Sequence, residues 1–146
     1  MDNKTDISCL VTKDGAEDGV WIQAELYGRK QPFEVCVIGA DADAVILHNK
    51  QSEKEASKAL GNLFSGGKTA DIETADDIVD KRIANAVVRM AGLRSMDGSP
   101  LMLQGIELKS DKESYSLLCR KVPAMIDFVV SKSNERENFL PGRKKD

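Results

Sequence analysis

The stretch Val20–Gly39, "VWIQAELYGRKQPFEVCVIG", decides the fold class of this chain. Apolar residues alternate with more polar neighbours in both of its halves, a period typical of half-buried β-strands. Arg29–Pro32, "RKQP", separates the halves with turn-forming residues. The sequence therefore predicts two antiparallel strands, Val20–Gly28 and Phe33–Gly39.

A third strand is predicted upstream, because Ile7–Thr12, "ISCLVT", is a short apolar run followed by turn formers at Asp14–Gly19. Three strands joined by short turns make an antiparallel meander over residues 7–39. Its apolar face needs a covering layer. Trp21 and Tyr27 fall on the opposite register, so we expect the second face to be partly covered as well.

The pattern changes to helix from Asp41 onward. Asp41 or Asp43 can cap a helix that runs to Leu60 and is charged nearly all round in its second half. Thr74 can cap a second helix, since acidic residues follow it and apolar residues recur at helical spacing up to Gly92.

Two further helices are predicted near the C-terminus. Ser110 and Glu113 have the spacing of a capping box, and Pro123 suits the first position of the last helix. The last helix carries an apolar stripe that we expect in the core: Val122, Met125, Ile126, Val129 and Val130. The turn Met96–Pro100 is a candidate hairpin tip between "GLRS" and "LMLQGIEL".

These elements predict an α+β fold in which an antiparallel β-meander of about three strands packs against a C-terminal set of about four helices. With 146 residues in the chain, the expectation is a single domain over residues 1–140, with the meander at 7–39, the helical part at 41–138 and a flexible basic tail at 141–146.

Gly61–Thr69, "GNLFSGGKT", nearly matches a phosphate-binding loop, but Asn62 stands where the motif has its first glycine. The loop must also follow a buried strand, and the preceding segment, Asn49–Leu60, is polar and rich in helix formers. We therefore interpret Gly61–Thr69 as a flexible connection between two helices.

Composition excludes several classes of function. The net charge is −3 and no basic cluster marks a nucleic-acid interface. No apolar run approaches the roughly twenty residues that span a bilayer, and the polar start, "MDNKTDIS", is unlike a signal peptide. A cytoplasmic protein that binds neither nucleic acid nor membrane is expected.

The sequence contains few residues of the types that usually act in catalysis. Cys9, Cys36 and Cys119 are widely spaced and predicted to be buried free thiols, and His48 is the only histidine. Carboxylates such as Glu34, Glu73 and Asp77 show no catalytic spacing in the sequence. We expect no catalytic residues, no metal and no cofactor, which favours binding over catalysis.

The order of the C-terminal segments carries a resemblance. It runs "ADDIVDKRIANAVVRMAGL", "RSMDGSPLML", "KESYSLLCRKV", and then a helix started by proline that ends in "SNERENFL". With the β-meander and "VCVIGADADAVILHNKQ" before it, the chain resembles the tail assembly chaperones of long-tailed phages and prophages, from about Ile7 to Leu140. In many members the chain closes with an acidic-Arg-x-Asn-Phe-Leu type ending, here Glu135–Leu140.

The resemblance implies a non-catalytic chaperone that binds the tape measure protein and keeps it soluble until tail-tube subunits assemble around it. Such a protein acts in the host cytoplasm and is absent from mature virions. In many members a frameshift adds a domain that recruits the tail-tube protein, and Lys144 and Lys145 lie where a slip would fall. A homo-oligomer is compatible with this role.

Two surfaces are candidates for partner binding. The first is the C-terminal ending, Glu137, Asn138, Phe139 and Leu140, whose apolar pair has the competing interpretation of packing back onto the last helix. The second is the charged helix, with Glu53, Lys54 and Lys58. Two other classes stay open: a structural tail component of the completion or terminator type, and a small enzyme of unrelated type.

Overall fold

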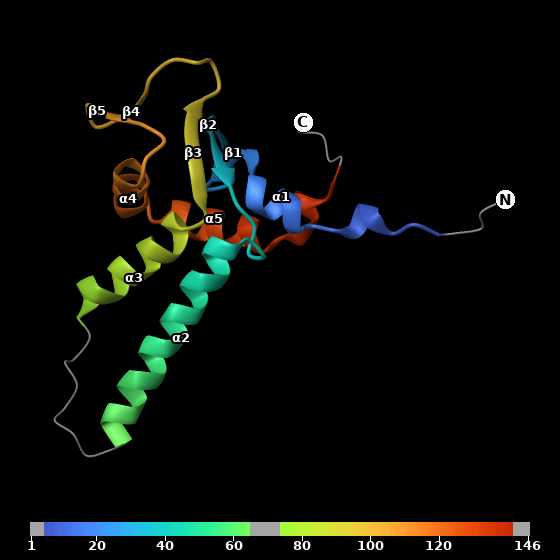
Figure 1. Ribbon diagram of the computed structural model, residues 1–146. Coiled ribbons are helices and arrows are strands. Elements are labelled where there is room, and N and C mark those ends of the chain that lie inside the picture. The colour runs from blue at the N-terminus through green and yellow to red at the C-terminus, as the bar shows by residue number, and fades with distance from the viewer. Residues whose placement is uncertain (1–4, 65–73, 142–146) are drawn as a thin grey trace.

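The computed structural model describes residues 5–64 and 74–141, and shows one three-stranded sheet, one small hairpin and several helices (Figure 1). The elements are η1 (Ser8–Leu10), α1 (Lys13–Asp18), β1 (Val20–Leu26), β2 (Arg29–Val37), α2 (Asp43–Phe64), α3 (Ala75–Val87), β3 (Met90–Ser95), β4 (Leu101–Leu103), β5 (Ile106–Leu108), α4 (Lys112–Lys121), α5 (Ala124–Asn134) and η2 (Arg136–Phe139). The predicted α+β class, a meander with C-terminal helices, is confirmed.

The main sheet has the order β1-β2-β3, antiparallel throughout. Tyr27 and Gly28 join β1 to β2, both with positive φ (56° and 73°), as a two-residue type I′ hairpin turn requires. The predicted strands at 20–28 and 33–39 are therefore confirmed within a few residues at each end, and β2 begins earlier, at Arg29.

The predicted strand at Ile7–Thr12 is wrong. Residues 8–10 form η1, and the expected turn at Asp14–Gly19 is mostly the helix α1. The third strand is instead β3, where the sequence predicts the end of a helix. The short apolar run at residues 7–12 satisfies the strand pattern locally, but the sheet fills its third position by pairing β3 with β2.

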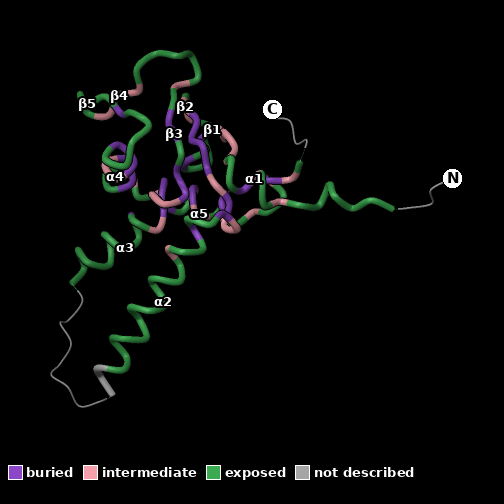
Figure 2. The backbone as a smooth tube through the Cα atoms, in the orientation of Figure 1, coloured by how far each residue is buried: buried purple, intermediate pink, exposed green. Residues whose placement is uncertain are grey.

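The core lies between the sheet and the helices α3, α4 and α5. The inward residues of β2, Val35 and Val37, are fully buried, and α5 contacts both β1 and β2. Figure 2 shows the buried residues gathered along the sheet and α5. Met125, Ile126 and Val129 of α5 are buried, with Val122 and Val130 packed at the margin, so the predicted core stripe is confirmed.

The second face of the sheet is covered by its own side chains. Trp21 lies against Gly92 on β3, and the Arg94 guanidinium carbon stands 3.9 Å from the centre of the Trp21 ring. Arg94 Nε also donates to Glu34 Oε1 at 2.9 Å. The expectation of a partly covered second face is met by Trp21, whereas Tyr27 sits in the turn and is 78% exposed.

The structure confirms some of the helix caps that the sequence predicts. Thr74 and Asp77 form the expected start of α3 as a reciprocal capping box, but α3 ends at Val87, before Met90 and Gly92. Pro123 occupies the N-cap of α5, within one residue of its predicted place.

The capping box predicted at Ser110 and Glu113 is wrong. Asp111 is the N-cap of α4 and accepts a hydrogen bond from the backbone N–H of Ser114, while the Ser110 hydroxyl bonds the backbone of Leu93 on β3. Two adjacent residues can each cap, and the tertiary contact with β3 decides between them.

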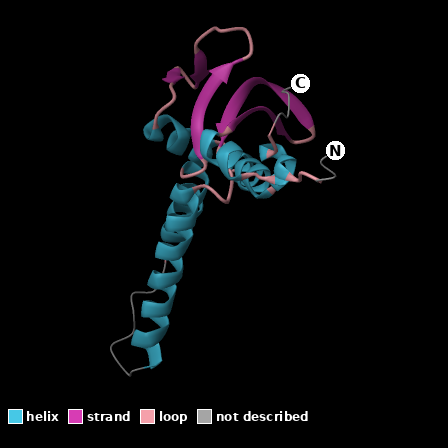
Figure 3. Cartoon of the chain, turned by 45° about the vertical axis from the view of Figure 1, so that its right-hand side comes forward, coloured by secondary structure: helices cyan, strands magenta, loops and turns pink. Residues whose placement is uncertain are grey.

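The long helix α2 projects away from the rest of the molecule (Figures 1 and 3). It extends to Phe64, so the first four residues of the predicted connection Gly61–Thr69 are helical, and the remainder lies outside the described residues. The predicted tail at 141–146 is described only at Pro141.

Candidate partner-binding site

An apolar groove of about 310 Å³ opens on the part of the molecule that carries the β4–β5 hairpin. Its lining is apolar apart from one glutamine and one tyrosine hydroxyl: Leu26, Tyr27, Gln31, Pro32, Phe33, Leu101, Met102, Leu103, Leu108, Leu118 and Val122. We call these residues the hairpin groove. A groove of this size and composition suits apolar side chains from a partner.

Three walls build the hairpin groove. The first is the end of the β1–β2 hairpin, with Leu26 and Phe33 on the sheet face that turns toward the core. The second is the β4–β5 hairpin, whose turn residues Gln104 and Gly105 both have positive φ and thus form a second type I′ turn. The third is the end of α4, with Leu118 in the last turns of the helix and Val122 as its C-cap.

The β4–β5 pairing corrects a sequence prediction. The turn at Met96–Pro100 is present, but it does not join two paired strands, because β3 pairs with β2 and β4 pairs with β5. The residues of "LMLQGIEL" fold on themselves around Gln104–Gly105. This arrangement places Leu101 and Leu103 over the groove, half-buried, with Met102 exposed at its mouth.

Tyr27 is the unusual residue of the hairpin groove. A type I′ turn favours asparagine, aspartate or glycine at its first central position, since other side chains are strained at positive φ. Here a tyrosine occupies that position, and its side chain is largely exposed. Strained backbone and an exposed aromatic ring together are typical of a residue kept for binding rather than for stability.

The predicted charged surface lies on α2, and Glu53, Lys54 and Lys58 are all exposed there. The same helix also exposes Ile46, Leu47 and Leu60, which the sequence does not single out as a site. In both Figure 1 and Figure 3 the tip of α2 lies at the end of the molecule opposite the β4–β5 hairpin. The structure therefore does not join α2 and the hairpin groove into one site.

The residues of the C-terminal candidate site differ in how far they are buried. Phe139 is 2% exposed and packs near Gly39, while Leu140 is half-buried. The competing interpretation, packing back onto the last helix, holds for Phe139 in part, because η2 contacts α1 as well as α5, and the buried side chain is not available to a partner in this conformation. The prediction assumes that a monomer need not bury an end of the chain, but the packing of η2 against α1 buries Phe139.

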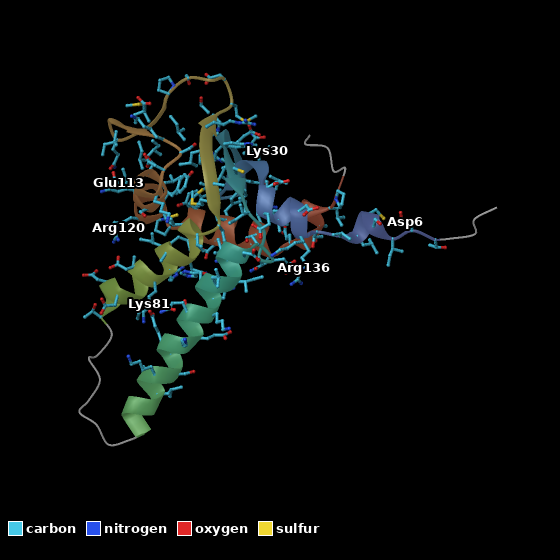
Figure 4. All side chains as sticks on the ribbon, viewed as in Figure 1. Asp6, Lys30, Lys81, Glu113, Arg120 and Arg136 are labelled. Carbon is cyan, nitrogen blue, oxygen red and sulfur yellow. The ribbon has the colours of Figure 1, made fainter. Side chains whose placement is uncertain are left out.

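The polar residues of that ending differ in accessibility. Glu137 is exposed, whereas the Asn138 side-chain amide donates to the carbonyl of Lys132 and to Glu135 Oε2. Asn138 therefore holds η2 onto the end of α5. Figure 4 shows Arg136 beside the start of α2, where it forms a two-bond ion pair with Asp41 at 2.8 and 3.1 Å.

The thiols and carboxylates show no catalytic arrangement among residues 5–61 and 74–141. Cys36 and Cys119 are buried, and burial raises the pKa of the Cys119 thiol to about 11. Cys9 is exposed, so the prediction of three buried thiols is wrong for it, since η1 lies outside the core. His48 is half-buried on α2.

The candidate carboxylates have structural partners. Glu34 pairs with Arg94 and Asp77 caps α3, while Glu73 lies outside the described residues. Within the described part of the chain no three potential ligands gather into a metal site. None of the described helices combines the length and apolar character needed to cross a bilayer.

No family model, no curated protein and no solved structure matches this chain.

Proposed function

We propose that this protein is a tail assembly chaperone of a long-tailed phage or prophage, which binds the tape measure protein and keeps it soluble while tail-tube subunits assemble around it. The proposal is supported by the resemblance over about Ile7–Leu140 and by one structural observation, the solvent-open hairpin groove. An exposed apolar concavity on a small acidic protein is a common mark of a protein-binding surface.

The physical task of such a chaperone is to cover apolar stripes on a long helical client. Helix-in-groove packing does this, because side chains spaced by three, four and seven residues enter a shared groove. A groove of about 310 Å³ covers only a few side chains, so each contact is weak. Weak contacts repeated along the client allow the growing tail tube to displace the chaperone.

The charged surface of α2, with Glu53, Lys54 and Lys58, is the second contact that we propose, with the client or with the tail-tube protein. The role requires partner binding alone and no cofactor. It places the protein in the host cytoplasm and outside the mature virion.

The test is co-expression with the long tape measure protein of the same locus, followed by a solubility assay and pull-down. The proposal predicts that the client moves from the pellet to the soluble fraction and co-purifies with this protein. A client that stays insoluble beside folded chaperone contradicts it. Stable incorporation of this protein into purified particles would instead identify a structural tail component.

A further inference from the structure

Two exposed basic residues, Arg29 and Lys121, lie next to residues that line the hairpin groove. Arg29 lies directly opposite Leu26 in the β1–β2 register, so both belong to the groove face of the hairpin. Lys121 is the last residue of α4 and follows Leu118 by three residues, so the two are neighbours on the helix surface. Arg29 and Lys121 are both exposed, and neither forms an ion pair with another residue in the described ranges 5–61 and 74–141.

On the β4–β5 hairpin, Glu107 is the cross-strand partner of Met102 and is exposed, on the opposite face from Leu101 and Leu108. The sheet and α4 walls of the groove have the cations Arg29 and Lys121 beside them. A partner that fills this groove has to avoid placing cations of its own next to these two residues.

Tyr27 stands at the same end of the groove as Arg29. Its side chain is exposed. Its positive φ disfavours tyrosine, and asparagine would be less strained at this turn position. Aromatic rings and arginines are the side chains that most often anchor protein interfaces. The adjacent pair therefore has the composition of a binding anchor.

We propose that the hairpin groove binds an amphipathic helix whose apolar stripe is bordered by carboxylates on the side that meets Arg29 and Lys121. The apolar stripe enters between Phe33, Leu103 and Val122, and Tyr27 covers it at the mouth. This inference rests on the proposed function for the identity of the client, a helix of the tape measure protein. The preference for acidic over basic residues beside the apolar stripe follows from the charges next to the groove and does not depend on the proposed function.

The first experiment uses two synthetic helical peptides as probes. Both carry leucines at i, i+3, i+4 and i+7, and they differ only in having glutamates or lysines beside that stripe. Binding to the full chain is measured by fluorescence anisotropy. The glutamate peptide is expected to bind on the order of tenfold more tightly, since two exposed charge pairs each contribute a few-fold in affinity.

Three variants locate the effect. The double variant Arg29→Glu and Lys121→Glu should reverse the peptide preference, which a merely structural loss would not do. Tyr27→Asn should weaken both peptides severalfold while leaving thermal stability equal or higher, because asparagine suits the turn. Lys30→Glu is the matched control, because Lys30 is exposed and pairs with Glu25 on the opposite face of the β1–β2 hairpin, and it should leave the preference unchanged. Equal binding of the two peptides, or an unchanged preference in the double variant, overturns the proposal.

The groove could instead bind a second copy of this chain, and sedimentation of the same protein samples tests for this self-association. If the groove variants change the sedimentation of the free protein while the wild type binds neither peptide, the groove joins copies of this chain and the inference fails.

Co-expression with the tape measure protein separates the two proposals. Groove variants that still solubilise the client leave the chaperone function standing and refute the groove as its site. A wild type that prefers the glutamate peptide but does not solubilise the client retains the groove inference and refutes the proposed function.

Discussion

Gly92 is the residue on which the covered second face of the sheet depends. A Cβ atom built at this position would lie 2.5 Å from Cη2 of Trp21, closer than a methyl group and a ring can approach. The ring in turn carries Arg94, whose Nε bonds Glu34. Because Gly92 has no side chain, Trp21 of β1, Glu34 of β2 and Arg94 of β3 can pack together on this face.

Gly92→Ala is expected to destabilise the protein by about 1–3 kcal/mol, the usual range for overpacking a tight site. Urea unfolding followed by Trp21 fluorescence measures the loss, and the emission of the folded state should also shift as the ring is displaced. Gly61→Ala on α2 is the control, because its Cβ meets open space and alanine favours helix. Equal stability of the two variants would show that the ring moves aside freely.

Asp41 predicts a pH dependence. The hydrogen bonds from Arg136 hold the pKa of the Asp41 carboxyl below its usual value of 3.8. Because the folded pKa is the lower one, the ion pair stabilises the protein above about pH 4, and this contribution is lost as the pH falls further.

Asp41→Asn should therefore be less stable than wild type by up to about 1 kcal/mol at pH 7, since Arg136 is exposed and Asp41 is partly exposed. The difference should shrink as the pH falls below about 4, because the carboxyl then takes up a proton. Urea midpoints measured between pH 2.5 and 7 test this, with Glu53→Gln as the control, since Glu53 has no ion pair among the described residues. A pH-independent difference would mean that Asp41 acts through packing instead.

At the scale of elements, η2 closes the fold by packing Phe139 beside α1. Gly15 allows this approach, because a Cβ there would overlap the Phe139 carbonyl oxygen. Phe139→Ala is expected to destabilise the protein by about 3–5 kcal/mol, as deletion of a buried aromatic ring does. Leu140→Ala, at a half-buried position, should have a much smaller effect.

Chemical denaturation of these two variants decides how client assays on the ending are to be interpreted. A client defect in Phe139→Ala then reflects unfolding, whereas a defect in a stable Leu140→Ala protein reports contact. If Phe139→Ala proves as stable as wild type, the ring is not part of the core in solution.

The elements that the sequence predicts well are those whose signals are local. β1, β2, α2 and the start of α3 follow from alternation, helix formers and a cap at Thr74 that acidic residues follow. β3 was missed because "MAGLRS" contains alanine and glycine, which disfavour strands, and Gly92 is there for the Trp21 contact. That requirement comes from a residue seventy-one positions earlier, so no local pattern reports it.

The hairpin groove was missed for the same reason. Its lining comes from two hairpins and the end of α4, which are far apart in the sequence, and most of its residues resemble ordinary core in sequence. The local signal that was available is Tyr27-Gly28, a turn with a tyrosine where asparagine is usual. The polar residues predicted on α2, in contrast, are exposed as expected, because a helix that is charged nearly all round has no side to bury.

At the scale of the whole molecule, the helix α2 extends from the packed core and makes few contacts with it. Ala42 and Val45 are buried where α2 begins, but nearly every described residue from Ile46 to Gly61 is exposed. A helix of 22 residues is about 33 Å long and is marginally stable in water without packing. The free protein should therefore hold α2 weakly beyond its first turns.

Hydrogen exchange followed by mass spectrometry tests this arrangement directly. In the free protein the amides of residues 50–61 should exchange orders of magnitude faster than those of β2 and α5, which open only with the core. Addition of the client should slow exchange in α2 if Glu53, Lys54 and Lys58 contact it, and should slow exchange at Tyr27 and in β4 and β5 if the hairpin groove does. Protection of α2 in the free protein equal to that of β2 would contradict the expectation. A dependence of that protection on protein concentration would then show that a second copy of the chain supports the helix.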